Sequence, residues 1–341
     1  MQATSRQTAL CLKVTCPLKL QQKARPQKFF LRRSRLFWNG PTAKVCLTVK
    51  DEPEIPKLRM APRTTTDDMI ARIEREQRAA GLQREMSLEK SLAPFRVGSV
   101  PYLNAVPLTR GLEDELTFLP PAQLAEQLHE GKLDAALLSI TEVLFSSEYD
   151  ILEGAAIASL GEVYSVFLAH KAPLEEIRVV HCDPASRSSV NLLRVLLAER
   201  GLNPEFQELK GSPQEKDAVL LIGNPAIEFR RAPHPHQIWD LGAAWFEMTK
   251  LPFVYAIWAL RRDKDTEVLR RQLKEAKDFG LDTLDYLIEN RTEYDREFRK
   301  DYLGWHIHYH LGADEKRGVA EFVRLLRKHS AREVFEPKYV A

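Results

Sequence analysis

From residue 95 to the end of the chain, short apolar runs alternate with longer amphipathic stretches. The runs that predict buried strands cover residues 95–100, 133–140, 164–170, 176–182, 218–223 and 253–262. Between several of them, apolar residues repeat with helical spacing, most clearly over residues 188–201, which end at a glycine. Alternating strands and helices predict an α/β fold with largely parallel sheets.

This part of the chain is long enough for two lobes of ordinary domain size. Two apolar stretches, residues 165–170 and 255–260, are expected to cross between the lobes. We therefore expect the chain to leave one lobe, build the second and return to the first. We expect one lobe at residues 95–172 and 258–341, the other at 173–257, and a helical extension at 61–94.

Residues 1–50 hold 11 Lys or Arg and no Asp or Glu, although the whole chain has a net charge of only +2. The remainder is therefore mildly acidic, which argues against nucleic acid as a partner. No apolar run has the length of a membrane span, so we expect no membrane partner either. Cys182 is the single cysteine after residue 50, which favours a reducing compartment and a cytoplasmic location.

Residues 1–60 form a basic leader that we expect to be disordered. Its composition is similar to that of an organellar transit peptide, and it lacks the apolar segment of a secretory signal. We favour a different interpretation, a start codon placed too early. Met86 opens a stretch that reads like the natural beginning of a cytosolic protein.

Polar residues follow four of the predicted strands, at the strand ends where α/β sheets bind ligands. In "PYLNAVPL", Asn104 either contacts a ligand through its amide or caps the next helix, and the spacing favours the cap. At the second junction, Ser139 and Glu142 form the pattern of a capping box. A cap at this position leaves room for a ligand as well.

The third junction brings hydroxyl groups and an arginine to the start of the clearest helix. Asp183 is followed by Ser186, Arg187, Ser188 and Ser189. Free N–H groups, hydroxyls and a guanidinium together suit a carboxylate or a phosphate. A capping Asp or Ser beside a solvated arginine explains the same residues equally well.

At the fourth junction, Gly223 allows a close approach of the backbone, and Asn224 offers an amide to a ligand. A plain strand-to-turn junction is an equal alternative. His306, His308 and His310 alternate and would share one face of a strand, as zinc ligands can. Their flanks read as helical, where residues two apart diverge, so we predict no metal.

Aromatic residues are dense over residues 238–260. We expect most of them in the core, with some as walls for a ring-shaped ligand. They are Trp239, Trp245, Phe246, Phe253, Tyr255 and Trp258.

Five motifs in order resemble those of the chorismate dehydratase family of menaquinone biosynthesis by the futalosine pathway. They are "VGSVPYLNAVPL", "LDAALLSITEV", "DPASRSSVNLLRVLL", "LLIGNPAI" and "DLGAAWFEMTKLPFVYAIWAL". The resemblance covers about residues 95–330. It implies a two-lobed fold like the type 2 periplasmic binding proteins, with the ligand in the cleft between the lobes. It also implies a lyase that dehydrates chorismate to 3-[(1-carboxyvinyl)oxy]benzoate without a metal or other cofactor.

The resemblance implies a set of site residues as well. Asn104 and Ser139 are expected to be catalytic. The expected substrate-binding residues are Tyr102, Ser186, Arg187, Ser188, Ser189, Gly223 and Asn224. The family often has an aspartate after the Ile-Gly pair where this chain has Asn224, which puts a charged role there in doubt.

The implied reaction removes a ring hydroxyl and a neighbouring ring proton, and the ring becomes aromatic. An amide is a poor base, so the proton goes to a substrate carboxylate or to water. Two other functions fit the same fold: a non-catalytic binding protein for small carboxylates, and the sister enzyme 1,4-dihydroxy-6-naphthoate synthase. The expected partner is a small-molecule substrate, and the oligomeric state is not predicted.

Overall fold

The structure, a computed structural model, describes residues 92–182 and 187–341. The predicted leader at 1–60 and nearly all of the extension predicted at 61–94 lie outside the described residues. So do residues 183–186, which include two of the polar residues at the third junction.

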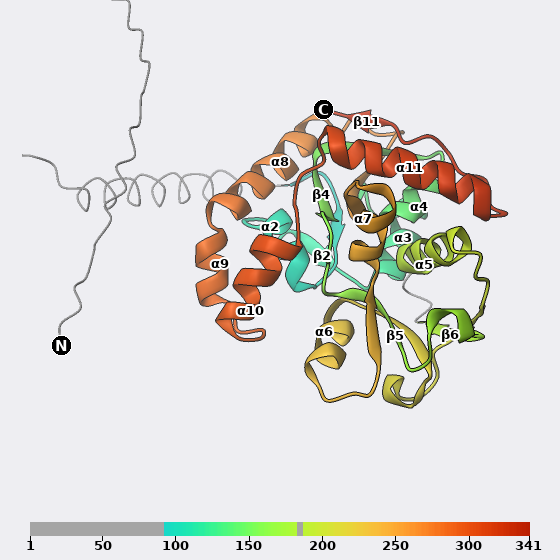
Figure 1. The fold of residues 1–341 in the computed structure, drawn as a ribbon. Coiled ribbons are helices and arrows are strands. Elements are labelled where there is room, and N and C mark those ends of the chain that lie inside the picture. The colour runs from blue at the N-terminus through green and yellow to red at the C-terminus, as the bar shows by residue number, and fades with distance from the viewer. Residues whose placement is uncertain (1–91, 183–186) are drawn as a thin grey trace, which may run out of the picture. The chain divides into compact units, whose positions relative to one another are not determined.

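Six of the described strands form the first of two mixed sheets, in the order β11-β4-β10-β3-β1-β2. Figure 1 labels β11, β4 and β2 of this sheet, and β5 and β6 of the second. These strands are β1 (Val97–Ser99), β2 (Leu116–Phe118), β3 (Ala135–Ser139), β4 (Tyr149–Ser159), β10 (Phe253–Arg261) and β11 (Tyr339–Val340). β1 runs parallel to β2 and β3, whereas β10 runs antiparallel between β3 and β4.

The second sheet has the order β7-β6-β8-β5-β9 among the described residues. Its strands are β5 (Val166–His170), β6 (Val179–Cys182), β7 (Glu205–Glu208), β8 (Ala218–Ile222) and β9 (Gln237–Asp240). β6 runs parallel to β7 and β8, whereas β5 runs antiparallel to both of its neighbours, β8 and β9.

The chain passes from the first sheet to the second between β4 and β5, and it returns between β9 and β10. Both passages come earlier in the chain than the predicted lobe boundaries after residues 172 and 257. β5 and β10 are the strands that enter each sheet after a passage, and both pair antiparallel. The expectation of largely parallel sheets is therefore wrong, because β5 and β10 run antiparallel to both of their neighbours.

Helices fill the segments between the strands. They are α2 (Val106–Thr109), α3 (Pro121–His129), α4 (Ile140–Leu144), α5 (Arg187–Glu199), α6 (Gly223–Arg231), α7 (Leu241–Thr249), α8 (Glu267–Asp282), α9 (Leu284–Asn290), α10 (Arg296–Asp301) and α11 (Ala313–His329). Shorter turns of helix are η1 (Leu103–Ala105), η2 (Leu174–Glu176), η3 (Pro213–Glu215) and the π-helix η4 (Tyr302–His306). None of the helices in the described part of the chain is both long and apolar enough to cross a membrane.

Local sequence explains where the helices beside the site begin and which faces they bury. α3 starts at Pro121, whose ring suits the first turn, and buries Leu124 and Leu128 one turn apart. Gly131 follows α3 in the left-handed region, with φ of 71°. α5 buries the apolar face of its 13 residues and also its first two serines. At the start of α5, Ser188 and Ser189 are therefore buried, whereas Arg187 is exposed.

Aromatic side chains hold the returning strand β10 against the last long helix. Trp245 and Phe253 meet edge to face at 5.2 Å, and each ring also meets Phe322 of α11. Trp258 is fully buried in the same strand. The predicted core role of these tryptophans and of Phe253 is confirmed.

Gly280 of α8 is expected to be essential for packing against α2. A Cβ at this position would lie 2.0 Å from the Pro107 carbonyl oxygen, which belongs to the backbone and cannot turn away. Gly280→Ala should lower the free energy of unfolding by about 1–3 kcal/mol in urea titrations. Gly304→Ala is the matched control, because a Cβ there meets no atom within 4 Å among the described residues. Equal stability of the two variants would contradict this packing argument.

Candidate functional site

A cavity of about 100 Å³ lies at the carboxyl ends of β1, β3 and β8 and at the start of α5. Its walls come from both sheets. The described residues that line it are Val100, Tyr102, Asn104, Pro121, Leu137, Ser139, Ile157, Arg187, Ser188, Ser189, Ile222, Gly223, Tyr255 and Ala256. This is the place where the polar strand ends of the sequence were expected to meet.

Asn104 reaches the cavity from η1, directly after β1. Tyr102 occupies the N-cap of η1 and Ala105 that of α2, so Asn104 caps neither helix. The interpretation that the spacing favoured, a capping asparagine, is therefore wrong. Asn104 Oδ1 is buried and has no hydrogen-bond partner among the residues that the structure describes. A buried acceptor without a partner carries a desolvation cost, which a ligand donor can remove.

Ser139 is at the N-cap of α4, but its side chain makes no capping hydrogen bond. Its Oγ lies 3.4 Å from Thr141 Oγ1, and the residue lines the cavity. The predicted capping box is wrong because Glu142 bonds with Arg187 instead of the N-cap backbone. A charged guanidinium is the stronger partner for a carboxylate than a neutral N–H. The Ser139 side chain therefore lines the cavity instead of capping α4.

Thr141 joins α4 to the start of α5. Its backbone N–H donates to Ser188 Oγ at 3.0 Å, and the two hydroxyls lie 2.7 Å apart. Thr141 is fully buried. Ser139, Thr141 and Ser188 thus form a row of hydroxyls that crosses from the first sheet to the second. Sequence reasoning missed Thr141, whose only signal was a second hydroxyl residue in an otherwise apolar segment.

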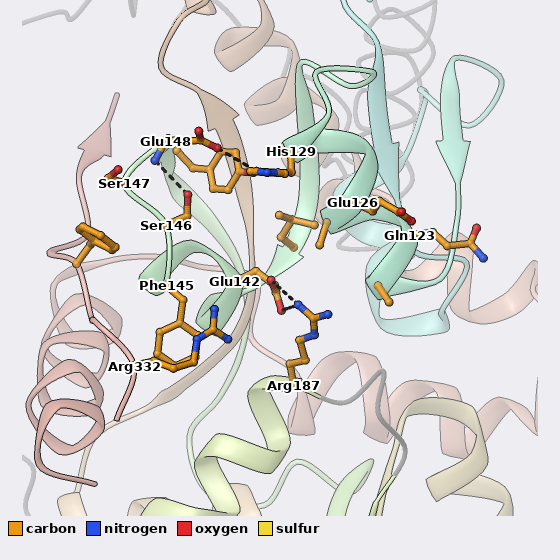
Figure 2. A pocket seen from close by; sticks show the side chains of 15 residues that line it. Gln123, Glu126, His129, Glu142, Phe145, Ser146, Ser147, Glu148, Arg187 and Arg332 are labelled. Atoms are coloured by element: carbon orange, nitrogen blue, oxygen red, sulfur yellow. Dashed lines mark hydrogen bonds and ion pairs between the residues drawn. The ribbon is translucent and has the colours of Figure 1, made fainter. Parts of the chain in front are cut away.

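Arg187 is the only charged residue among the described residues that line the cavity. Its Nη1 donates to both Glu142 oxygens, at 3.1 and 3.2 Å, and Figure 2 shows the two side chains facing one another. Its Nη2 and Nε make no hydrogen bond to the described residues, so they are available to a ligand. Arg187 also opens α5, whose first-turn N–H groups add positive potential.

A larger groove of about 770 Å³ lies beside the cavity, and Arg187 and Glu142 belong to its wall (Figure 2). Arg332 stacks over the Phe145 ring on one side of it, at 4.2 Å. Arg187 lines both hollows, so its ion pair with Glu142 lies where the cavity and the groove adjoin.

Tyr255 of β10 forms an aromatic wall of the cavity. Its hydroxyl lies 3.1 Å from Ser159 Oγ, which in turn donates to the Gly161 carbonyl. Burial raises the pKa of Tyr255 well above its usual value, so the phenol is neutral at physiological pH. The prediction that one of the clustered aromatic residues faces the site is consistent with this position.

Asp240 holds the segment through which the chain enters the second sheet. Its buried carboxylate accepts hydrogen bonds from the N–H groups of Val163 at 3.1 Å, Tyr164 at 2.8 Å and Ala243 at 3.0 Å. Tyr164 has φ of 67°, a left-handed conformation that needs such support. Burial raises the pKa of Asp240, and the three backbone hydrogen bonds oppose that rise. Ser165 follows Tyr164, and its backbone carbonyl accepts a hydrogen bond from the Gly223 N–H at 2.9 Å. This hydrogen bond holds Gly223 at the cavity.

The structure brings together seven of the nine site residues that the sequence predicted. The seven that line the cavity are Tyr102, Asn104, Ser139, Arg187, Ser188, Ser189 and Gly223. Asn224 is in the first turn of α6 and is not among the lining residues. Ser186 lies outside the described residues. Their roles remain predictions.

Histidine, cysteine and carboxylate side chains form no group of three that could hold a metal ion in residues 92–182 and 187–341. His306 ends the π-helix η4, whereas His308 is extended and bridges to Ala158 of β4. The alternating histidines therefore do not lie together on one strand.

Residues 95–328 match a family model that is described as menaquinone biosynthesis. Chorismate dehydratase of Thermus thermophilus is 32% identical over 261 residues, which cover 69% of this chain and 96% of that protein. Chorismate dehydratase of Campylobacter jejuni subsp. jejuni is 24% identical over 228 residues, covering 65% of this chain and 89% of that protein.

Solved structures share the fold at lower identity. Protein AF1704 from Archaeoglobus fulgidus has a TM-score of 0.55 at 18% identity and covers 69% of this chain and 97% of its own. The alkanesulfonate-binding protein SsuA from Xanthomonas axonopodis pv. citri, bound to MOPS, has a TM-score of 0.51 at 15% identity, with coverages of 69% and 92%. The predicted periplasmic-binding-protein-like fold is confirmed.

Proposed function

The chain belongs to the menaquinone biosynthesis family, and we propose that it dehydrates chorismate to 3-[(1-carboxyvinyl)oxy]benzoate. The relative from Thermus thermophilus supports this activity, since the match spans nearly all of that protein. The observation that carries the proposal is the chemistry of the cavity. A single cation, three serines and an asparagine line it, and no acidic residue does among those described.

Chorismate carries two carboxylates, and the cavity offers donors for both. Arg187 Nη2 and the first N–H groups of α5 receive one carboxylate, with Ser188 and Ser189 beside it. Ser139 receives the other. The ring then lies against Tyr255, with Asn104 at the reacting edge.

Formation of the aromatic ring drives the reaction. The protein therefore needs only to orient the substrate and to keep bulk water out of the site. The ring hydroxyl leaves as water, and the neighbouring ring proton is lost to a substrate carboxylate or to water. Tyr255 is neutral and the cavity holds no acid, so no side chain on its described walls is a strong base. The protein orients the ring and excludes bulk water.

The cavity as described is smaller than the 300–1,000 Å³ typical of ligand sites. Two contacts close it across the sheets: the Thr141–Ser188 hydrogen bonds and the Glu142–Arg187 ion pair. Entry of chorismate therefore requires the two sheets to part at these contacts. The exposed ion pair contributes little stability and is easily exchanged for a ligand carboxylate.

Purified protein mixed with chorismate tests the proposal. We expect chorismate to disappear and 3-[(1-carboxyvinyl)oxy]benzoate to form in equal amount, as followed by chromatography. The protein must be free of contaminating enzymes, so the Asn104→Ala variant purified in the same way is the blank. Chorismate that binds in calorimetry but is not consumed would instead indicate a binding protein. Absence of both binding and turnover would refute the proposed substrate.

A further inference from the structure

Thr141 of α4 is not among the described residues that line the cavity, but it holds a residue that is. Its backbone N–H donates to Ser188 Oγ at 3.0 Å, and its own hydroxyl lies 2.7 Å from the same oxygen. Ser188 is the second residue of α5 and lines the cavity. Two hydrogen bonds with one distant residue therefore fix the start of α5.

This contact joins the two sheets in a buried place. α4 follows β3 of the first sheet, whereas α5 follows β6 of the second. Thr141 is 0% exposed and Ser188 is 5% exposed. The adjacent ion pair between Glu142 and Arg187, seen in Figure 2, leaves about half of the arginine side chain exposed. Since a buried hydrogen bond is costly to leave unmade, the hydroxyl contact holds α5 more firmly than the exposed ion pair does.

The two hydrogen bonds also determine what Ser188 can offer to a ligand. A hydroxyl has one proton to donate and two lone pairs that accept. When Thr141 gives both its N–H and its O–H to Ser188 Oγ, both lone pairs are occupied and the serine proton is left for another acceptor. In the reverse direction, Ser188 gives its proton to Thr141 and has no donor left for a ligand.

A carboxylate ligand favours the first of these two arrangements, because a carboxylate only accepts hydrogen bonds. A hydroxyl that itself accepts hydrogen bonds is polarised, which makes it a stronger donor. Thr141 therefore prepares Ser188 for a carboxylate without touching the ligand. Because Thr141 lies outside the cavity lining, its contact with Ser188 can form again after the sheets have parted to admit a ligand.

We propose that Thr141 is a positioning residue, which seats the start of α5 against α4 and makes the Ser188 hydroxyl a donor to a ligand carboxylate. This inference rests on the proposed function, in which that carboxylate belongs to chorismate and also contacts Arg187. The hydrogen bond from Ser188 forms when the substrate binds and is kept through the reaction. Thr141 therefore acts on substrate binding rather than on the rate of the chemical step.

A pair of substitutions at Thr141 separates the hydroxyl from the methyl group. Thr141→Val keeps the shape of the side chain and removes the hydroxyl, and we expect KM for chorismate to rise about 10-fold with kcat nearly unchanged. Thr141→Ser keeps the hydroxyl and loses the methyl group, and its KM should stay close to that of the wild type. If packing is the role of Thr141, the serine variant will be the impaired one, and the proposal fails.

Thr109→Val is the matched control for the valine variant. Thr109 is also buried, and its hydroxyl donates to carbonyls of the preceding turn, those of Val106 at 3.2 Å and Ala105 at 3.4 Å. The same chemical change there should leave KM unaltered. An equal rise in KM for Thr109→Val and Thr141→Val would overturn the proposal.

A double-variant cycle tests whether Thr141 acts through Ser188. In protein that already carries Ser188→Ala, the change Thr141→Val should have no further effect on KM. Losses that multiply would show that Thr141 acts elsewhere, and the proposal would fail.

Urea titration of the same variants without ligand keeps this test apart from the proposed function. We expect the double variant to lose clearly less stability than the sum of the two single losses, because both substitutions break one contact. Wild-type protein that is inactive on chorismate, but shows this coupling, would refute the substrate and retain the positioning of α5 by Thr141. Stability losses that add would refute the positioning even in an active enzyme.

Discussion

Replacing Asn104 with alanine is expected to lower kcat/KM for chorismate about 100- to 1,000-fold, the loss usual for one preorganised polar group at a reacting atom. The substitution removes the buried Oδ1 from the cavity wall. It breaks no helix cap, since Tyr102 and Ala105 occupy the flanking N-caps. The variant should therefore keep its fold, which thermal unfolding checks, while steady-state kinetics measure the loss.

Asn290→Ala is the control for this experiment. Asn290 is exposed on α9, and among the described residues its amide donates only to the Tyr286 carbonyl of the same helix, at 2.9 Å. The same chemical change there should leave the kinetics unaltered. If Asn104→Ala retains the rate of Asn290→Ala while both are folded, the role of Asn104 in the reaction is wrong.

Asp240→Ala is expected to have the largest effect on stability, a loss of about 3 kcal/mol in the free energy of unfolding. Three backbone N–H groups lose their acceptor at once, two of them in the segment that enters the second sheet. Asp295→Ala is the control, because Asp295 caps α10 but accepts from one backbone N–H, that of Phe298. It should cost about 1 kcal/mol. Urea titration of both variants distinguishes these losses, and equal losses would contradict the role given to Asp240.

The Asp240→Asn variant adds a test by pH. Because burial raises the pKa of Asp240, the folded protein holds this proton more tightly than the unfolded chain does. The stability of the wild type should therefore rise relative to Asp240→Asn as pH falls from neutrality toward about 4, the usual range of an aspartate. If the stability difference between the wild type and Asp240→Asn stays constant with pH, or falls as pH falls, then burial does not outweigh the backbone hydrogen bonds in setting the pKa of Asp240.

The sequence predicted the elements whose periodicity is strong and local. β1, β3, β8 and β10 are within the runs named from apolar spacing, α5 begins one residue before its run, and the ends of these elements place the cavity. β4 was not predicted, because it mixes acidic residues and a glycine into an apolar strand without alternation. The mixed strand directions were also missed, since direction depends on where the chain returns and not on local pattern.

Local spacing was least reliable at the site itself. It favoured caps for Asn104 and Ser139, and neither side chain caps a helix, because partners from distant segments decide what each residue does. Arg187 takes Glu142 from the predicted capping box, and Thr141 pairs with Ser188, 47 residues further along the chain. Such long-range pairs leave no mark on either short segment. The order of several motifs along the chain carried the information that single spacings lacked.

A crystal structure of the Asn104→Ala variant with chorismate tests the central claim most directly, since slow turnover leaves the substrate intact. We predict chorismate in the cavity between the sheets, with one carboxylate on Arg187 and the start of α5, the other at Ser139, and the ring hydroxyl directed at residue 104. Chorismate bound in the groove beside Arg332, or turned so that its hydroxyl faces away from residue 104, would contradict the account.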